Sequence, residues 1–241
     1  MVGLRRYLEH EEFVHKRLSR EIDKLMVIDA GAAWSLKAMY CTAFGKADEA
    51  IYASETAMRN NISTPQMGNL VVNVYGNLAA HSKGLEYLKR AADPRNGHFT
   101  SFINWLVVFG GIRAAREHCE RARTMGIEVP TLPIDLDRAI SAIDGFDTSS
   151  LDDSMIATIL DVFCGVMMKH GFLISENRTR MVQFEEGAIQ FQLPVEVAPD
   201  VAAEMTLDAI DRLVKLPFNS SAVSVSFTLR KENSTEALQT A

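Results

Sequence analysis

The residues whose spacing most suggests chemistry are three asparagines in the segment MGNLVVNVYGN, residues 67–77. Asn69, Asn73 and Asn77 are four residues apart, so on a helix their side chains form one row. Asparagine is a poor helix former, roughly 0.6 kcal/mol worse than alanine. Its amide offers donors and an acceptor that match a peptide backbone. The row therefore predicts a peptide-binding surface, and the alternative is the solvated face of an amphipathic helix.

Cysteine and histidine give no sign of a metal or cofactor. The three cysteines, Cys41, Cys119 and Cys164, are far apart and form no C-x-x-C motif. The six histidines show no ligand spacing, so the sequence predicts neither a disulfide framework nor a zinc site, and no cofactor. We expect the cysteines to be buried apolar side chains.

Support for catalysis is weak. The acidic pairs Asp152/Asp153 and Glu185/Glu186 are expected at a helix start and a turn, where carboxylates are ordinarily solvated. Phosphate-loop and hydrolase motifs are absent from the sequence. The chemically mixed segment KHGFLISENRTR, residues 169–180, is where an enzyme would have its site, with Cys164 or Ser175 as the nucleophile. The simpler interpretation is a charged connection.

The charge is unevenly distributed along the chain. The net charge is −6, but residues 1–130 hold 17 Lys and Arg against 14 Asp and Glu, whereas residues 131–241 hold 8 against 17. This asymmetry favours two modules, and the acidic second half argues against a nucleic-acid partner. No apolar run approaches the ~18 residues of a membrane span, and the N-terminus is charged at once. We expect a cytoplasmic protein with no membrane partner.

Residues 31–127 contain a repeated pattern of paired helices. A first helix over 32–44 and a second over 47–59 are followed by two similar pairs. Small and apolar residues recur at steps of 34 and then 31 residues, which predicts close helix crossings. The matched positions are Cys41, Tyr75 and Leu106; Ala50, Gly84 and Ala115; and Ala57, Ala91 and Ala122.

These pairs resemble the tetratricopeptide repeat. Trp34 opens the first helix as in that family, Gly45 and Gly110 lie at the turn, and Ala79 replaces the turn glycine in the second pair. The resemblance implies a stack of helical hairpins, whereas a plain helical bundle is the alternative. It does not extend to the C-terminal half.

The resemblance also implies where a ligand would bind. The first helices of such pairs line a concave face, on which peptide-binding members of the family use asparagines to hold a peptide. Alignment by the two steps brings Asn104 opposite Asn73. The predicted peptide-binding residues are Asn69, Asn73, Asn77, Asn104, Thr100 and Met39.

A basic face is predicted on the last helix of the repeats. Arg113, Arg116, Arg121 and Arg123 could contact an acidic partner, an acidic peptide or the acidic second half of this chain. A solvated outer face is the simpler alternative. RNA is disfavoured because no aromatic residues alternate with the arginines.

The flanking segments complete an α+β fold. Apolar residues at helical spacing over 4–28 predict a helix that caps the repeats or mediates dimerisation. After 131, a helix over 152–169 precedes a hairpin in which Val182 and Phe184 continue the apolar face of Ile189 and Phe191. A helix and a final strand follow. The predicted domains are a helical repeat module, 1–130; a small α-β-β-α-β domain with a mostly antiparallel sheet, 131–233; and a disordered tail, 234–241.

These observations favour a non-enzymatic adaptor or regulatory subunit. Its helical repeats would bind a protein or peptide segment, and its sheet or N-terminal helix would allow a homo-oligomer. Two alternatives stay open. One is an enzyme with a site at the seam of the two modules near residues 170–180, and the other is a structural subunit of a larger assembly.

Overall fold

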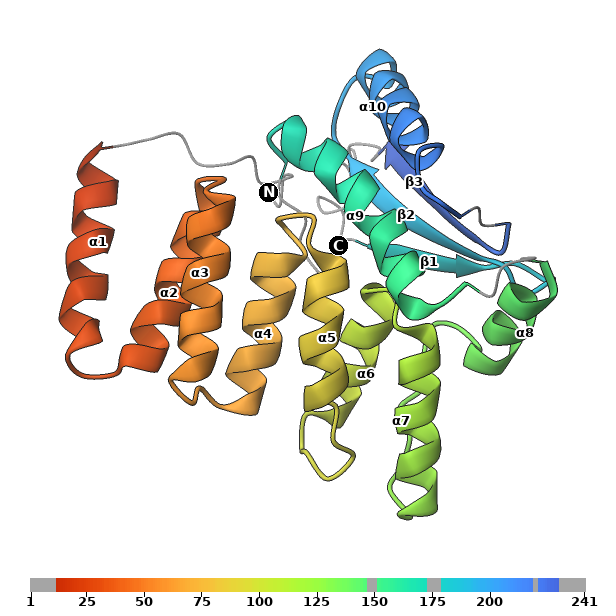
Figure 1. The fold of residues 1–241 in the computed structure, drawn as a ribbon, viewed down its shortest axis with the longest axis horizontal. Helices are drawn as coiled ribbons and strands as arrows, with labels where there is room; N and C mark the ends of the chain where they lie inside the picture. Colours follow the sequence, from red (N-terminus) through yellow and green to blue (C-terminus); the bar gives the residue numbers. More distant parts are fainter. Residues whose placement is uncertain (1–11, 147–150, 173–178, 219–220, 230–241) are drawn as a thin grey trace, which may run out of the picture.

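The computed structural model describes residues 12–146, 151–172, 179–218 and 221–229. The predicted tail, 234–241, and the start of the predicted N-terminal helix, 4–11, lie outside these ranges. Within them the chain forms ten helices and three strands (Figure 1). The α+β class is therefore confirmed.

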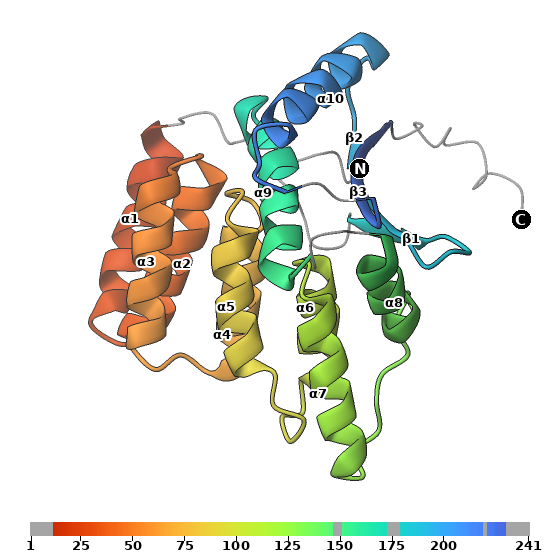
Figure 2. The same cartoon turned by 45° about the vertical axis from the view of Figure 1, so that its right-hand side comes forward.

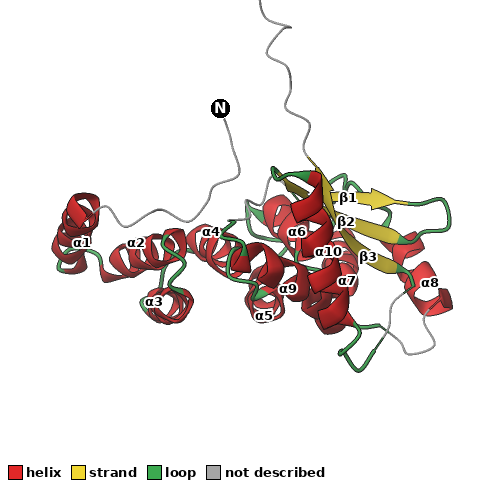
Figure 3. Ribbon diagram, turned by 90° about the horizontal axis from the view of Figure 1, so that it is seen from above, coloured by secondary structure: helices red, strands yellow, loops and turns green. Residues whose placement is uncertain are grey.

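Seven helices form the first half. Six of them lie in two layers, with α2, α4 and α6 on one side and α3, α5 and α7 on the other (Figure 3). Helix α1 packs on α2, and its Ile22 is buried while the residues on either side of it in the chain are exposed. The bounds are α1 (Glu12–Met26), α2 (Ala30–Ala43), α3 (Ala47–Arg59), α4 (Thr64–Tyr75), α5 (His81–Ala91), α6 (Phe99–Val108) and α7 (Ile112–Thr124).

The turns that join the three helix pairs share one backbone geometry. Gly45, Ala79 and Gly110 have positive φ angles of 69°, 51° and 84°, and they recur at the two steps predicted from the sequence. In each turn the residue that follows donates its N–H to a carbonyl five residues earlier. These bonds are Lys46 N to Cys41 O, 2.9 Å; Ala80 N to Tyr75 O, 2.9 Å; and Gly111 N to Leu106 O, 2.8 Å. This is the Schellman arrangement that ends a helix and satisfies its last carbonyls.

The helices cross where the sequence has small residues. Ala50, Gly84 and Ala115 are all buried, as predicted. A Cβ added at Gly84 would lie 2.6 Å from the Phe109 ring and 3.0 Å from the Cβ of Tyr75. Only glycine therefore fits at this crossing, because no L side chain can approach an aromatic ring so closely.

The second half folds against the first. Its elements are α8 (Leu136–Phe146), α9 (Asp153–Lys169), β1 (Arg180–Gln183), β2 (Ile189–Val195), α10 (Pro199–Leu213) and β3 (Val223–Leu229). Helix α9 lies between the helical pairs and the sheet (Figure 2). One hydrophobic core runs from α2 through α7 to β2 and β3, and a second joins α9, α10 and the sheet.

The sheet is mixed, so the prediction of a mostly antiparallel sheet is wrong. Strand β2 pairs antiparallel with β1, as the hairpin predicted, but parallel with β3 over the whole length of both strands. The cause is α10, which carries the chain back along the sheet so that β3 starts beside the start of β2. A strand–helix–strand connection of this kind gives parallel strands.

The face of the hairpin is shifted by one residue from the prediction. Met181 pairs with Phe191 on the buried face, and Val182 pairs with Gln190 on the polar one. Val182 is 36% exposed and Phe184 45% exposed, so they do not continue the apolar face of β2. The turn after Gln183 sets this register, and a shift of one residue moves every side chain to the other face.

Ala79 offers a test of the repeated turn. The left-handed conformation costs alanine about 1 kcal/mol more than glycine. We expect Ala79→Gly to raise the free energy of unfolding by roughly 0.5–1 kcal/mol in urea titrations. The converse change at the equivalent turn, Gly45→Ala, should lower it by about as much. A destabilised Ala79→Gly protein would show that contacts of the Ala79 methyl group outweigh its backbone strain.

Candidate functional site

The asparagine row lies along α4 and past its end. Asn69 and Asn73 are exposed, whereas Asn77 is 9% exposed. The Nδ2 atom of Asn73 donates to the backbone oxygen of Asn69 at 2.8 Å, and that of Asn77 donates to the oxygen of Asn73 at 2.7 Å. Asn73 thus uses one amide hydrogen within α4, and Asn77 uses one to bond back to α4 from beyond its end. Asn73 keeps a second amide hydrogen and its oxygen for another group.

The other predicted peptide-binding residues belong to the same layer of helices. Met39 on α2 is 37% exposed, Thr100 on α6 is exposed, and Asn104 is half-buried. Leu36, on α2 as well, is 48% exposed. Helix α4 packs against both α2 and α6, so the structure brings these side chains to one layer. Asn77 differs because its side chain is buried.

The arginines of α7 divide into two groups. Arg113 pairs with Asp144, with Nη2 and Oδ1 2.6 Å apart, and Arg116 pairs with Asp137. Both carboxylates belong to α8, so the acidic second half of the chain meets these two arginines. Arg121 and Arg123 are exposed, and no carboxylate among the described residues lies within 4.0 Å of them.

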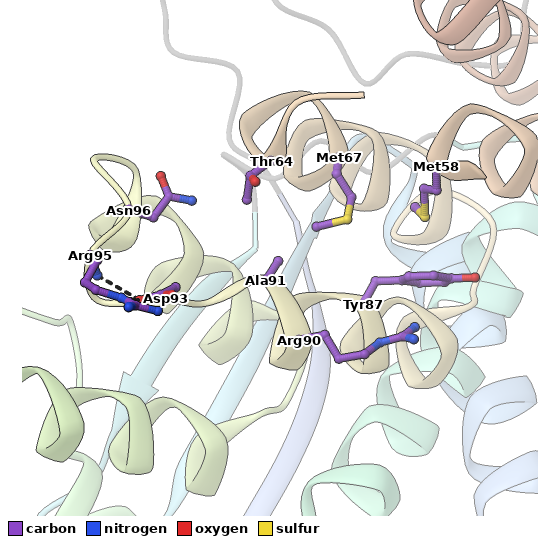
Figure 4. Close-up of a pocket in the computed structure, with 9 residues that line it drawn as sticks. All are labelled: Met58, Thr64, Met67, Tyr87, Arg90, Ala91, Asp93, Arg95 and Asn96. Carbon is purple, nitrogen blue, oxygen red and sulfur yellow. Dashed lines mark hydrogen bonds and ion pairs between the residues drawn. The ribbon is translucent and has the colours of Figure 1, made fainter. Parts of the chain in front are cut away.

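A hollow that the sequence did not predict opens between α3, α4 and α5 (Figure 4). Its volume is about 670 Å³. The Arg90 guanidinium lies 4.9 Å from the centre of the Tyr87 ring, and Arg95 forms a two-point ion pair with Asp93. The lining residues are Met58, Thr64, Met67, Tyr87, Arg90, Ala91, Asp93, Arg95 and Asn96. Met67 and Asn69 are two residues apart on α4, so the hollow and the asparagine row face different sides of that helix.

Two carboxylates of α9 attach it to the helical pairs. Asp161 accepts hydrogen bonds from the backbone N–H groups of His81 and Ser82 and from the Ser82 hydroxyl, at the start of α5. Asp153 accepts 2.9 Å bonds from the backbone N–H groups of Arg113 and Ala114, at the start of α7. The two aspartates are eight residues apart, about two helical turns, so they lie on one face of α9. Each satisfies N–H groups that have no partner within their own helix.

The expectation that Asp153 is solvated is wrong. Its exposed fraction is 5%, and burial raises the pKa of its carboxyl even though two backbone N–H groups act in the opposite direction. The neighbouring Asp152 caps α9 itself by accepting the N–H of Met155 at 2.8 Å. Asp153 is turned instead towards α7. The sequence suggested only one role for this pair, because both residues suit a helix start.

A thiol, an imidazole and a carboxylate meet at the same seam. The Sγ atom of Cys164 is 3.9 Å from Nε2 of His81, whose Nδ1 is 3.1 Å from Oδ1 of Asp161. The order resembles a nucleophile, its base and an orienting group. Cys164 is only 1% exposed and His81 4%, so a substrate cannot reach the sulfur in this conformation. All three cysteines are buried and free, as predicted.

The contacts with Cys164 and Asp161 change the pKa of His81. Burial alone lowers it, but the attraction of Cys164 and the hydrogen bond to Asp161 outweigh burial, and the pKa is raised to about 10. His81 also lies against Phe109, with ring centres 4.6 Å apart. The raised pKa favours the charged imidazolium, which pairs with Asp161 and so links α5 to α9.

The chain matches no protein-family model, no curated protein and no solved structure in the three comparisons made. Of the helices in the described ranges, none combines the length and apolar character needed to cross a membrane. Of the segment 169–180, the structure describes 169–172 and 179–180, so Ser175 lies outside it.

The attachment by Asp161 can be tested through stability. Asp161→Ala removes the acceptor of four hydrogen bonds and leaves half-buried donors unsatisfied, so the free energy of unfolding should fall by about 3 kcal/mol. The control Asp152→Ala removes an exposed cap and should cost about 1 kcal/mol. Urea denaturation of both variants measures the difference. Equal losses would mean that the seam contact does not hold α9 in place.

The charge on His81 gives a pH dependence. A pKa raised from 6.5 to about 10 means that the folded chain binds a proton that the unfolded chain releases between these values. The free energy of unfolding should therefore fall as pH rises from 7 to 8, by up to ~1.4 kcal/mol per pH unit. His81→Gln should reduce this slope. His118, whose pKa is lowered by burial, shifts in the opposite direction, so His118→Gln should not reduce the slope.

Proposed function

We propose that this protein is a non-enzymatic adaptor or regulatory subunit. Its helical pairs, similar to tetratricopeptide repeats, would bind a protein or peptide segment on the layer formed by α2, α4 and α6. The observation that carries the proposal is the exposed mixture of amide and aliphatic side chains on this layer. Asn69 and Asn73 of α4 are exposed, as are Leu36 and Met39 of α2, the helix on which α4 packs.

This combination suits an extended chain. Amide donors and acceptors can pair with backbone groups at any sequence, and the aliphatic residues add contact area without demanding one particular side chain. The Asn73 amide is already held by its bond to the backbone oxygen of Asn69, so little side-chain freedom is lost on binding. A ligand held in this way would be recognised mainly by being extended.

The repeated turns support the likeness to tetratricopeptide repeats. Three helix pairs end their first helix with the same left-handed residue and the same hydrogen bond, and small residues occupy the crossings of the pairs. This regularity favours a stack of hairpins over a plain bundle. A cytoplasmic location and a protein partner belong to the same proposal.

An enzyme is the second candidate, and the contact among Cys164, His81 and Asp161 is the observation that favours it. The site would lie at the seam of the two halves, close to the segment 170–180. It requires an opening motion, because Cys164 and His81 are buried. A small molecule that stabilises the protein, with the effect lost in Cys164→Ala, would favour this candidate over the adaptor. A structural subunit is the third candidate, and it predicts a stoichiometric complex that does not depend on the asparagines.

The adaptor is tested by a double variant. Asn73→Ala with Asn104→Ala removes one exposed and one half-buried amide from two neighbouring helices, so capture of partner proteins from the native host should be lost. The melting temperature should change little, since Asn73 is exposed and alanine is a better helix former. The readout is affinity purification followed by mass spectrometry, with a thermal melt of each variant.

The control for this experiment is Arg90→Gln with Met67→Ser, which changes the hollow on the other side of α4. This variant should retain the partners. If the asparagine variant keeps its partner proteins and the control variant loses them, the hollow is the binding surface. Retention by both would contradict peptide binding by the helical pairs.

A further inference from the structure

Helix α10 has two apolar faces. Ala202, Met205 and Ala209 are buried against α9 and the sheet. On the other side, Leu207 is 63% exposed, Ile210 46% and Val214, at the C-cap, 72%. Their spacing of three and four residues places them in one line along the helix. A helix on the surface of a globular protein needs only one apolar stripe, so the core does not account for this outer line.

The outer line lies where a partner can approach it. Figure 1 shows α10 at the edge of the molecule, beyond α9 and the sheet. Single exposed aliphatic side chains are common on protein surfaces and need no explanation. Three of them in one line over two turns form a continuous apolar strip, which is typical of a surface that binds another protein.

An acidic row follows one border of this strip. Asp200, Glu204 and Asp211 are all exposed, and their positions on the helix put them next to one another. In the part of the chain that the structure describes, neither lysine nor arginine lies within 4.0 Å of these three carboxylates. Asp208 is different because it pairs with Lys169 and Arg212. The row therefore carries three carboxylates that form no ion pair with the described residues.

We propose that the outer face of α10 docks a basic amphipathic helix of a partner protein. Such a helix would cover Leu207, Ile210 and Val214 with its own apolar stripe and place lysine or arginine beside the acidic row. A second copy of α10 fits less well, since symmetric pairing would bring like charges close to the same interface. Charge complementarity thus selects a different and basic partner.

This surface is independent of the proposed peptide site. It lies in the C-terminal half, whereas the asparagines and the exposed aliphatic residues beside them lie on α2, α4 and α6. Binding at α10 can therefore be measured in the full chain whether or not the helical pairs bind a peptide.

The test uses two synthetic amphipathic helices that share one leucine stripe. One has lysine along the border of the stripe and the other has glutamate. Fluorescence anisotropy with the full chain should show binding of the lysine peptide, weakened by added salt, and no binding of the glutamate peptide. Leu207→Gln with Val214→Gln should weaken binding about tenfold or more. Glu204→Gln with Asp211→Asn should remove most of the salt dependence.

The control variant is Met125→Gln, which changes an exposed apolar residue (44%) beyond the end of α7 and should leave the affinity unaltered. Circular dichroism of each variant checks that the fold is retained. Equal binding of the two peptides would overturn the proposal, as would unchanged binding after the Leu207 and Val214 substitutions. A dimer of the chain that dissociates in the Leu207 and Val214 variant would assign the face to a second copy and overturn it too.

Discussion

The structure depends on one interaction: two carboxylates of α9 bind the N-terminal ends of α5 and α7. The N–H groups at a helix start have no acceptor within the helix. When such a group is buried, leaving it without a hydrogen bond costs more free energy than when it is exposed. Asp161 and Asp153 on α9 accept hydrogen bonds from these N–H groups of α5 and α7. The same bonds therefore cap two helices and fix the position of α9. Because α9 carries the sheet and α10 on its other side, these contacts and the hydrophobic core that both halves share set the relation of the two halves.

Much of the helical half could be predicted from residue spacing. The alanine and glycine positions at steps of 34 and 31 indicated where helices cross, and the turn residues at the same steps indicated where they end. These signals are local, since a crossing needs a small residue and a left-handed turn favours glycine. Ala79 shows that the pattern holds even where the residue type departs from it, because the surrounding hydrogen bonds impose the turn.

The features that could not be predicted depend on contacts between residues distant in the sequence, which a local pattern does not contain. The direction of β3 follows from the path of α10, and the role of Asp153 follows from where α7 starts. The hollow between α3, α4 and α5 is lined by residues from three helices and the segment after α5, none of which is unusual alone. The asparagine row could be recognised in the sequence, but the hydrogen bonds from its side chains to its own backbone could not.

The late position of α9 in the chain has a consequence for synthesis. Helices α5 and α7 leave the ribosome about 80 and 40 residues before the aspartates that complete them, as the pairs His81–Asp161 and Arg113–Asp153 require. In a nascent chain that ends before α9, the N–H groups at the starts of α5 and α7 lack their carboxylate acceptors. The apolar surface that α9 covers in the folded chain is also exposed. Folding of the first half is therefore coupled to translation of the second, and truncation near residue 130 removes its native support.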